Sequence, residues 1–282
     1  MDIGLARTFL TVAETGSFIT AGRHMNITQS TVSARIRNLE EALGQALFDR
    51  SKTGAELTTA GEQFRRHALT LVRVWQHARF EVGLAERHRD HLSVGAPQGL
   101  WTGFLIGWVG WMRDNIPDIA VSASSETNAS LSQRMLDGTL DLAVTYRPLQ
   151  HPGIVSEHLF EDVFARVITA SPGTRRDQIE HIFINWGPDI RSEDAVVDPQ
   201  FMNAGLNLDV GGMGLDYMLE HPCTAYLPMR VCKPYIARKR MRLAARSRKF
   251  SYPVFMAYPE YRDEDAYEPI LRGLREQAAA IA

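Results

Sequence analysis

A run of hydrogen-bonding side chains between residues 28 and 37 carries the clearest chemistry in this chain. The run contains two arginines, and no acidic residue follows until Glu40. Glutamine, serine and threonine near the start of a helix can reach the edges of DNA bases, and arginine can bind guanine or phosphate. The candidate DNA contacts in the run are Thr28, Gln29, Ser30, Thr31, Ser33, Arg35 and Arg37.

Helices and a tight turn are needed to position this run. Apolar residues recur at helical spacing over residues 5–13, and Gly16 stands where a helix ends in the left-handed conformation. Ser17 can cap a second short helix, and Thr28 can cap a third that runs to about Ala42. The inner face of this third helix is expected to carry Val32, Ile36, Leu39 and Leu43. Helix, turn and helix at this spacing is typical of a module that places one helix in the major groove.

A small hairpin, or wing, is predicted over residues 47–57, with Lys52, Thr53 and Gly54 at its tip. Arg50 and Lys52 would flank the duplex as phosphate contacts. Residues 1–58 contain six Lys or Arg and six Asp or Glu, so this module has no net basic charge. Binding must then rest on a local basic face and on the use of two copies.

A long helix is predicted over residues 59–88. We expect it to pair with the same helix of a second chain and so to bring two DNA-binding modules together. Thr59 and Glu62 form a capping box at its start. Apolar residues then repeat at spacings of four and three, in a heptad pattern. Such a stripe more often packs inside its own domain, but because this helix joins two domains we favour pairing between chains. The candidate dimerisation residues are Phe64, Leu71, Trp75 and Val82.

Composition is consistent with a cytoplasmic protein of more than one domain. The 282 residues carry a formal net charge of −2, with no membrane-length apolar run and no secretory signal pattern. Cys223 and Cys232 indicate a reducing compartment without a disulfide framework. Two buried, inert thiols are favoured over a redox sensor.

From residue 92 onward, short strands alternate with helices, which predicts an α/β fold. We expect helices over residues 99–113, 128–136 and 264–279. Strands are expected over 92–96, 119–125, 140–146, 154–170, 182–186, 206–210, 224–227 and 250–258. Ligands of open α/β sheets bind at the carboxyl ends of strands, where exposed helix amides favour an anion. The candidate ligand-binding residues at these ends are Gln98, Gly99, Trp101, Thr102, Thr127, Asn128, Tyr146, Gly211 and Gly212. Alternatively, Thr102 and Asn128 only support their helices.

The segment FLTVAETGSFITAGRHMNITQSTVSARIRNLEEALGQALFDR, with the later LTTAGE, resembles the winged helix-turn-helix of LysR-type transcriptional regulators. The pattern T-Q-S-x-V-S-x-R-I-R-x-L-E, together with residues 185–189 (Asn-Trp-Gly-Pro-Asp), is similar to the H-NS-dependent flagellar regulator (HdfR) subgroup. Ala34 departs from the family, in which many members carry a polar or basic residue there. Base readout at that point would then fall to Ser33 and Arg35.

The resemblance implies an α+β, multi-domain chain with three parts. These are a winged helix-turn-helix at 1–58, a dimerisation linker helix at 59–88 and an effector-binding domain at 89–282. The last part would have a two-lobed, periplasmic-binding-protein-like α/β fold. Lobe I would comprise about 89–165 and 255–282, and lobe II about 166–254.

By the same resemblance, the chain would be a sequence-specific regulator acting as a dimer or homotetramer on an interrupted palindrome in double-stranded DNA. A small, often anionic metabolite between the lobes would modulate it. The alternative is an effector-independent repressor or architectural protein whose C-terminal domain only assembles oligomers. Catalytic motifs and metal-ligand spacings are absent, so neither an enzyme nor a cofactor is expected.

A basic run between Arg230 and Lys249 contains nine Lys or Arg and no acid. It could touch DNA, an effector or a second dimer, although a solvated face is the default interpretation.

Overall fold

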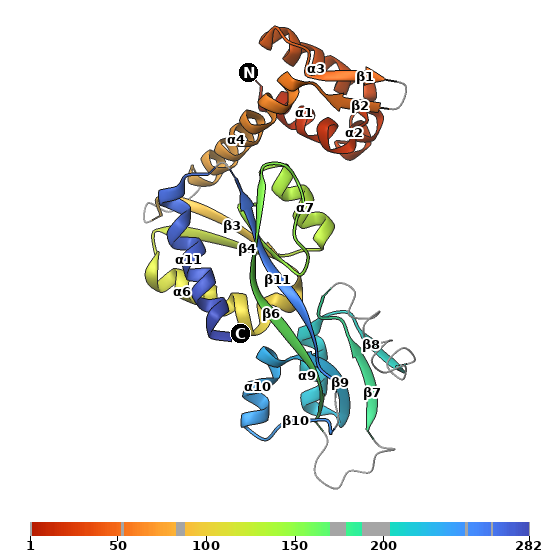
Figure 1. Ribbon diagram of the computed structural model, residues 1–282, viewed down its shortest axis with the longest axis vertical. Coiled ribbons are helices and arrows are strands. Elements are labelled where there is room, and N and C mark those ends of the chain that lie inside the picture. Colours follow the sequence, from red (N-terminus) through yellow and green to blue (C-terminus); the bar gives the residue numbers. More distant parts are fainter. Residues whose placement is uncertain are drawn as a thin grey trace.

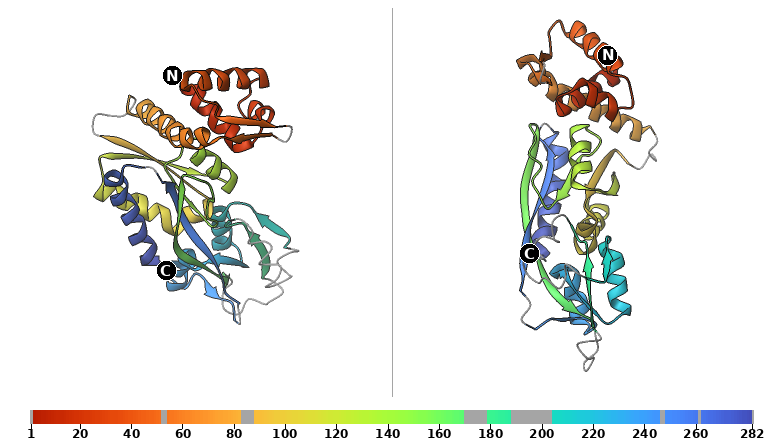
Figure 2. Two further views of the ribbon diagram at one scale, coloured as in Figure 1. Left: turned by 45° about the horizontal axis from the view of Figure 1, so that its top comes forward. Right: turned by 90° about the vertical axis from the view of Figure 1, so that its right-hand side faces the viewer.

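Three bodies follow one another along the long axis of the molecule: a helical N-terminal domain, a first lobe and a second lobe (Figure 1). This computed structural model describes residues 2–51, 54–82, 88–169, 179–187, 204–245, 248–260 and 262–281. Both further views keep the N-terminal domain at one end, with the first lobe between it and the second (Figure 2).

The N-terminal domain consists of three helices and a hairpin: α1 (Ile3–Thr15), α2 (Phe18–His24), α3 (Gln29–Leu43), β1 (Phe48–Ser51) and β2 (Gly54–Leu57). The expected caps are confirmed. Gly16 ends α1 with a φ of 61°, and the side chains of Ser17 and Thr28 accept backbone N–H groups at the starts of α2 and α3. Local capping therefore fixes where each helix begins and ends.

The core of this domain lies between α1 and α3. Val32, Ile36 and Leu39 are fully buried, as the helical spacing predicts. Each such side chain contributes roughly 1.5–3 kcal/mol when removed from water. The expectation for Leu43 was wrong: it is 42% exposed, because the last turn of α3 extends past this core.

The long helix α4 (Thr59–Glu81) leads from the hairpin towards the first lobe (Figure 1). Thr58, one residue earlier than expected, caps it by accepting the Gly61 N–H at 3.0 Å. The end of the predicted helix, residues 83–87, lies outside the described residues.

One twisted sheet runs through both lobes in the order β4-β3-β5-β11-β6-β9-β7-β8, and β10 also pairs with β6. The strands are β3 (Asp90–Ala96), β4 (Ile119–Ser125), β5 (Leu142–Thr145), β6 (Ile154–Ile168), β7 (Glu180–Ile184), β8 (Leu206–Leu208), β9 (Cys223–Pro228), β10 (Arg242–Leu243) and β11 (Phe250–Pro259). The antiparallel pair β6 and β11 is the continuous connection between the lobes, because its two ends pair with β5 and with β9.

Helices cover this sheet in each lobe. Lobe I has α5 (Gln98–Leu100), η1 (Trp101–Leu105), α6 (Ile106–Asn115), α7 (Asn128–Leu136) and α11 (Glu264–Ile281), and lobe II has α9 (Gly211–Glu220) and α10 (Met229–Ala237). Trp108 of α6 and Leu271 of α11 are buried in the core of lobe I, and Met218 of α9 in that of lobe II. Helix α10 was not predicted, because its sequence was interpreted as part of a solvated basic run.

The single helix predicted over residues 99–113 is wrong. The chain instead breaks within η1, where Thr102 has a ψ of 121° and Gly103 a φ of 75°. Glycine is needed at the break because a side chain rarely adopts this φ. A Cβ at Gly103 would also lie 3.3 Å from the carbonyl oxygen of Arg230.

Candidate DNA-binding surface and interlobe cleft

The exposed face of α3 carries part of the predicted DNA-contacting run. Gln29, Ser30 and Arg37 are exposed, and the Gln29 side-chain amide donates to the Ser33 hydroxyl at 3.3 Å. Thr28 accepts the Thr31 N–H at 3.2 Å, so its oxygen is partly engaged in capping. The exposed groups that this face offers to a partner are the Gln29 amide, the hydroxyls of Thr28 and Ser30, and the Arg37 guanidinium.

Arg35 does not project from this face. It is half-buried, and its guanidinium donates to the hydroxyl of the fully buried Thr8 on α1 at 3.3 Å. The expectation that Arg35 replaces a polar residue at the exposed Ala34 position is therefore not met by this conformation. The side chain of Arg50 on β1, and the whole of Lys52, lie outside the described residues.

Helix α4 carries an exposed apolar stripe towards its C-terminal end. Leu71, Val74 and Trp75 are 38%, 62% and 47% exposed, and Val82, just beyond the helix, is 91% exposed. Phe64 was wrongly assigned to the dimerisation stripe. It is 8% exposed and packs edge-on to the ring of Phe9 at 5.0 Å, because the first turns of α4 close the N-terminal core. The stripe available for a second chain therefore begins near Leu71.

The N-terminal domain also contacts lobe I of its own chain. The side chain of Glu14, on α1, hydrogen-bonds to Gln133 on α7, and Gln133 Nε2 donates to Asp137 Oδ1 at 3.1 Å. Burial raises the pKa of both Glu14 and Asp137, and the negative charge of Asp137 raises the pKa of Glu14 further, while the hydrogen bonds from Gln133 oppose both shifts. Arg7, His24 and Arg65 also surround this acid pair and favour its ionised form.

This contact predicts that stability falls as pH rises. The folded-state pKa values of Glu14 and Asp137 exceed those of the unfolded chain, so the folded state binds more protons between the two sets of values. We expect Glu14→Gln to raise Tm by roughly 1–3 °C at pH 7 and by less near pH 4.5. Glu276→Gln, at an exposed position of α11, is the control. Thermal unfolding at constant ionic strength from pH 4.5 to 7.5 checks this, and an equal effect of both variants would contradict it.

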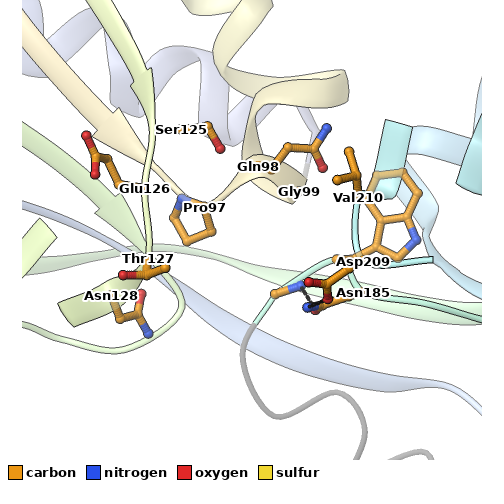
Figure 3. A pocket seen from close by; sticks show the side chains of 12 residues that line it. Pro97, Gln98, Gly99, Ser125, Glu126, Thr127, Asn128, Asn185, Asp209 and Val210 are labelled. Atoms are coloured by element: carbon orange, nitrogen blue, oxygen red, sulfur yellow. Dashed lines mark hydrogen bonds between the residues drawn. The ribbon is translucent and has the colours of Figure 1, made fainter. Parts of the chain in front are cut away.

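A cavity of about 450 Å³ lies between the lobes. Figure 3 shows Glu126, Thr127 and Asn128 on one side of it and Asn185, Asp209 and Val210 on the other. The cavity is lined by Pro97, Gln98, Gly99, Ser125, Glu126, Thr127, Asn128, Asn185, Trp186, Gly187, Asp209 and Val210. It therefore lies at the ends of β3 and β4 in lobe I and of β7 and β8 in lobe II, as expected for an open α/β sheet.

Four predicted ligand-binding residues line this cavity: Gln98, Gly99, Thr127 and Asn128. Gln98 also links the two lobes, because its side-chain oxygen accepts the N–H of Gly211 in lobe II at 3.0 Å. The Thr127 hydroxyl accepts the Ser130 N–H at 3.2 Å, and Asn128 accepts the Thr145 hydroxyl at 2.8 Å. Thr127 therefore serves as the cap of α7 as well as a part of the cavity wall.

The other five predicted residues do not line the cavity. Trp101 packs against the core of lobe I and donates its indole N–H to Ala96, because η1 turns it inward. Tyr146 is 4% exposed and donates to Asp162 at 2.8 Å. The remaining three residues are Thr102, Gly211 and Gly212. Gly211 lies under Trp186, whose ring atoms would be 2.5 Å from any Cβ there.

Several lining residues were missed as site residues. Asn185, Trp186 and Gly187 were singled out only as a subgroup signature, yet they line the lobe II side. Pro188 and Asp189 of that signature lie outside the described residues. Glu126 directly follows the strand predicted over 119–125, a position that could have identified it. Asp209 lay inside the strand predicted over 206–210, and it follows a strand only because β8 ends at Leu208.

The cavity wall carries negative rather than positive charge. Its described lining contains two carboxylates, Glu126 and Asp209, and neither Lys nor Arg. Hydrogen bonding from Ser130 and from Arg134 lowers the pKa of Glu126, despite its partial burial. Asp209 is exposed and accepts the Asn185 side-chain amide at 2.8 Å. Because Glu126 also forms an ion pair with Arg134 of α7, Asp209 supplies the main negative charge of the described lining.

The basic run does not form one surface. Arg230 is buried at the start of α10, whereas Arg238, Lys239 and Arg240 are exposed in the turn that follows α10, and Arg242 is exposed on β10. These elements lie at the opposite end of the molecule from the N-terminal domain (Figure 1). Both cysteines are free and buried, as expected, and burial raises the pKa of Cys232 to about 11. No described helix is both long and apolar enough to cross a membrane.

Comparisons with known proteins agree with this architecture. Residues 3–62 match the model of the bacterial regulatory helix-turn-helix protein, lysR family, and residues 85–279 match that of the LysR substrate binding domain. The HTH-type transcriptional regulator HdfR of Salmonella newport (strain SL254) is 34% identical over 197 residues, covering 69% of this chain and 70% of the relative.

Solved structures share the fold over nearly the whole chain. Full-length LysG from Corynebacterium glutamicum with bound effector Arg has a TM-score of 0.59 and 17% identity, covering 99% of each chain. Vibrio fischeri DarR in complex with DNA has a TM-score of 0.57 and 19% identity, covering 98% of each. The chain therefore belongs to the LysR family and is an HdfR-like transcriptional regulator, in which a helix-turn-helix DNA-binding domain is joined to an effector-binding domain.

Proposed function

We propose that this regulator senses a small zwitterionic or cationic metabolite in the cavity between its lobes and reads its operator through α3. The observation that carries the effector assignment is the cavity of about 450 Å³, with Asp209 exposed on one wall and the start of α7 on the other. The N-terminal amides of α7 favour a carboxylate, and Asp209 favours a cationic group. An amino acid with a basic side chain combines both.

The ligand of one relative is consistent with this charge arrangement. LysG of C. glutamicum is described with bound effector Arg. L-Arginine is therefore a suitable first probe, with L-lysine as a second cationic compound. A dicarboxylic acid such as succinate tests the anionic effector expected from the sequence.

We expect L-arginine to raise the Tm of the full-length protein. A ligand at one hundred times its Kd stabilises the folded state by about 2.7 kcal/mol. For a domain of this size, that corresponds to a rise in Tm of roughly 5–10 °C. Asp209→Asn should weaken L-arginine binding about tenfold, because a charge-assisted hydrogen bond is lost. Asp216→Asn, on the exposed side of α9, is the matched control.

The opposite outcomes separate the alternatives. Stabilisation by succinate but not by L-arginine would overturn the assigned charge of the effector. Failure of every compound in a broad screen of small acids, amines and amino acids, with DNA binding intact, would favour effector-independent repression or an architectural role.

We propose the domain limits 1–58, 59–88 and 89–282, a dimer or tetramer formed through α4, a cytoplasmic location and no catalytic activity. Movement of the lobes would change the spacing of the paired DNA-binding domains and the bending of an interrupted palindrome.

A further inference from the structure

A buried guanidinium joins the two lobes beneath the cleft. Arg230, at the start of α10, and Asp162, on β6, each have a side chain that is 2% exposed. Nε and Nη2 of Arg230 donate to the two oxygens of Asp162 at 3.1 and 2.9 Å, which makes the pair bidentate. The Tyr146 hydroxyl donates to Asp162 at 2.8 Å and accepts from Nη2 at 3.2 Å. These three residues are named the interlobe triad.

The protonation states of Tyr146 and Arg230 are fixed over the physiological range. Burial raises the pKa of Tyr146 well above its usual value, and the negative charge of Asp162 raises it further. Burial alone would lower the pKa of Arg230, but Tyr146 and Asp162 raise it overall. The guanidinium of Arg230 therefore stays charged and the phenol of Tyr146 stays neutral, so the hydrogen bonds between them persist over this range.

The same guanidinium holds the helix break of lobe I. Arg230 Nη2 donates to the Gly99 carbonyl oxygen at 2.7 Å, and Nη1 donates to that of Thr102. The Ile106 N–H donates to Trp101 and Phe104, so the Thr102 carbonyl lacks the bond that a regular helix would give it from Ile106. Arg230 thus replaces helical hydrogen bonds at the break.

Residues 98–102, which include the two carbonyl groups bound by Arg230, also form part of the cleft wall. Gln98 and Gly99 line the cavity, and Gln98 accepts the Gly211 N–H from lobe II. Gly99 packs directly on the backbone of Trp186, because a Cβ there would lie 1.8 Å from its carbonyl oxygen. A displacement of residues 98–102 would therefore disturb the cleft and the bonds to Arg230 together.

We propose that Arg230 is a positioning residue for the effector cleft. It holds the broken helix in the conformation that shapes the cavity wall, and it transmits movements of that wall to α10 in lobe II. The effector part of this inference rests on the proposed function, but the positioning of residues 98–105 does not. Asp162 and Tyr146 fix the guanidinium so that it reaches both carbonyls.

Hydrogen exchange of the ligand-free, full-length protein tests the positioning role. In Arg230→Lys, which keeps the charge but not the forked geometry, amides of residues 99–106 should exchange at least about tenfold faster than in the wild type. Amides of α1–α3 and α11 should be unchanged. Arg238→Lys, at an exposed position ending α10, is the matched control and should alter none of them.

Unchanged exchange at residues 99–106 in a folded Arg230→Lys protein would overturn the proposal. Equal acceleration throughout lobe I would also overturn it, because that result describes a general loss of stability. If Arg230→Lys fails to fold, Tyr146→Phe replaces it in the test, because this variant loses only one hydroxyl. Faster exchange confined to residues 99–106 in Tyr146→Phe would support the proposal, and exchange at the wild-type rate would reject it.

The affinity of the wild type and of Tyr146→Phe for L-arginine distinguishes a failure of the proposed role of Arg230 from a failure of the proposed effector. If the wild type binds L-arginine, Tyr146→Phe should weaken that binding at least about threefold. The substitution keeps the ring that packs on Gly187 and removes only the hydroxyl bonded to Asp162 and Arg230. Unaltered binding would reject the transmission from Arg230 to the cleft. If the wild type binds no probe, the proposed effector fails, while the exchange result still decides the role of Arg230 at the helix break.

Discussion

Replacing Trp75 by glutamate is expected to convert the dimer into monomers and to lower operator affinity by about 10²–10⁴-fold, the gain that linked binding sites provide. Trp75 is 47% exposed at the centre of the stripe that begins at Leu71, so the substitution places a charge where a second copy of α4 would pack. Because the N-terminal module has no net basic charge, we expect a single copy to bind DNA weakly.

The measurement has two parts. Sedimentation equilibrium gives the oligomeric state, and fluorescence anisotropy gives affinity for a duplex selected from a random pool by the wild-type protein. Thr70→Glu adds the same charge at an exposed position of α4 outside the stripe and should leave both values unchanged. A dimeric Trp75→Glu protein with undiminished affinity would show that the chains associate elsewhere.

The sequence predicted the N-terminal domain well because its signals are local. Capping residues such as Ser17 and Thr28 act within one turn of their positions, and a helical period reports burial without knowledge of the partner. The assignment of Phe64 was wrong for the same reason. Periodicity identifies an apolar stripe, but only the fold decides that its first turns cover Phe9 and its later turns remain exposed.

The cleft was predicted only in part, because its geometry depends on contacts between distant residues. Strand ends correctly indicated Gln98 and Thr127 as lining residues. Arg230 bonds to Asp162, 68 residues away, and to Gly99, 131 residues away, and no local pattern distinguishes it from its solvated neighbours. The helix break at Gly103 was missed because apolar spacing continues across it.

Gln29→Ala is expected to lower affinity for the selected duplex by about 10–100-fold, the usual range for losing a bidentate base contact. Gln29 is uncharged and exposed at the start of α3, so affinity for random duplexes should change little. Gln45→Ala makes the same chemical change at an exposed position just beyond the end of α3 and serves as the matched control.

Arg37→Ala distinguishes base contacts from phosphate contacts on the same helix. Arg37 is exposed one turn beyond Ser33, and its charge is free of the α1 contact that holds Arg35. If Arg37 binds phosphate, its loss should weaken specific and random duplexes alike and reduce the salt slope by about one. Loss of affinity confined to the selected duplex would instead show that Arg37 contacts bases.

If Gln29→Ala weakens both classes of duplex equally, the first turn of α3 does not carry base recognition, and sequence specificity must come from the wing or from the shape of the DNA.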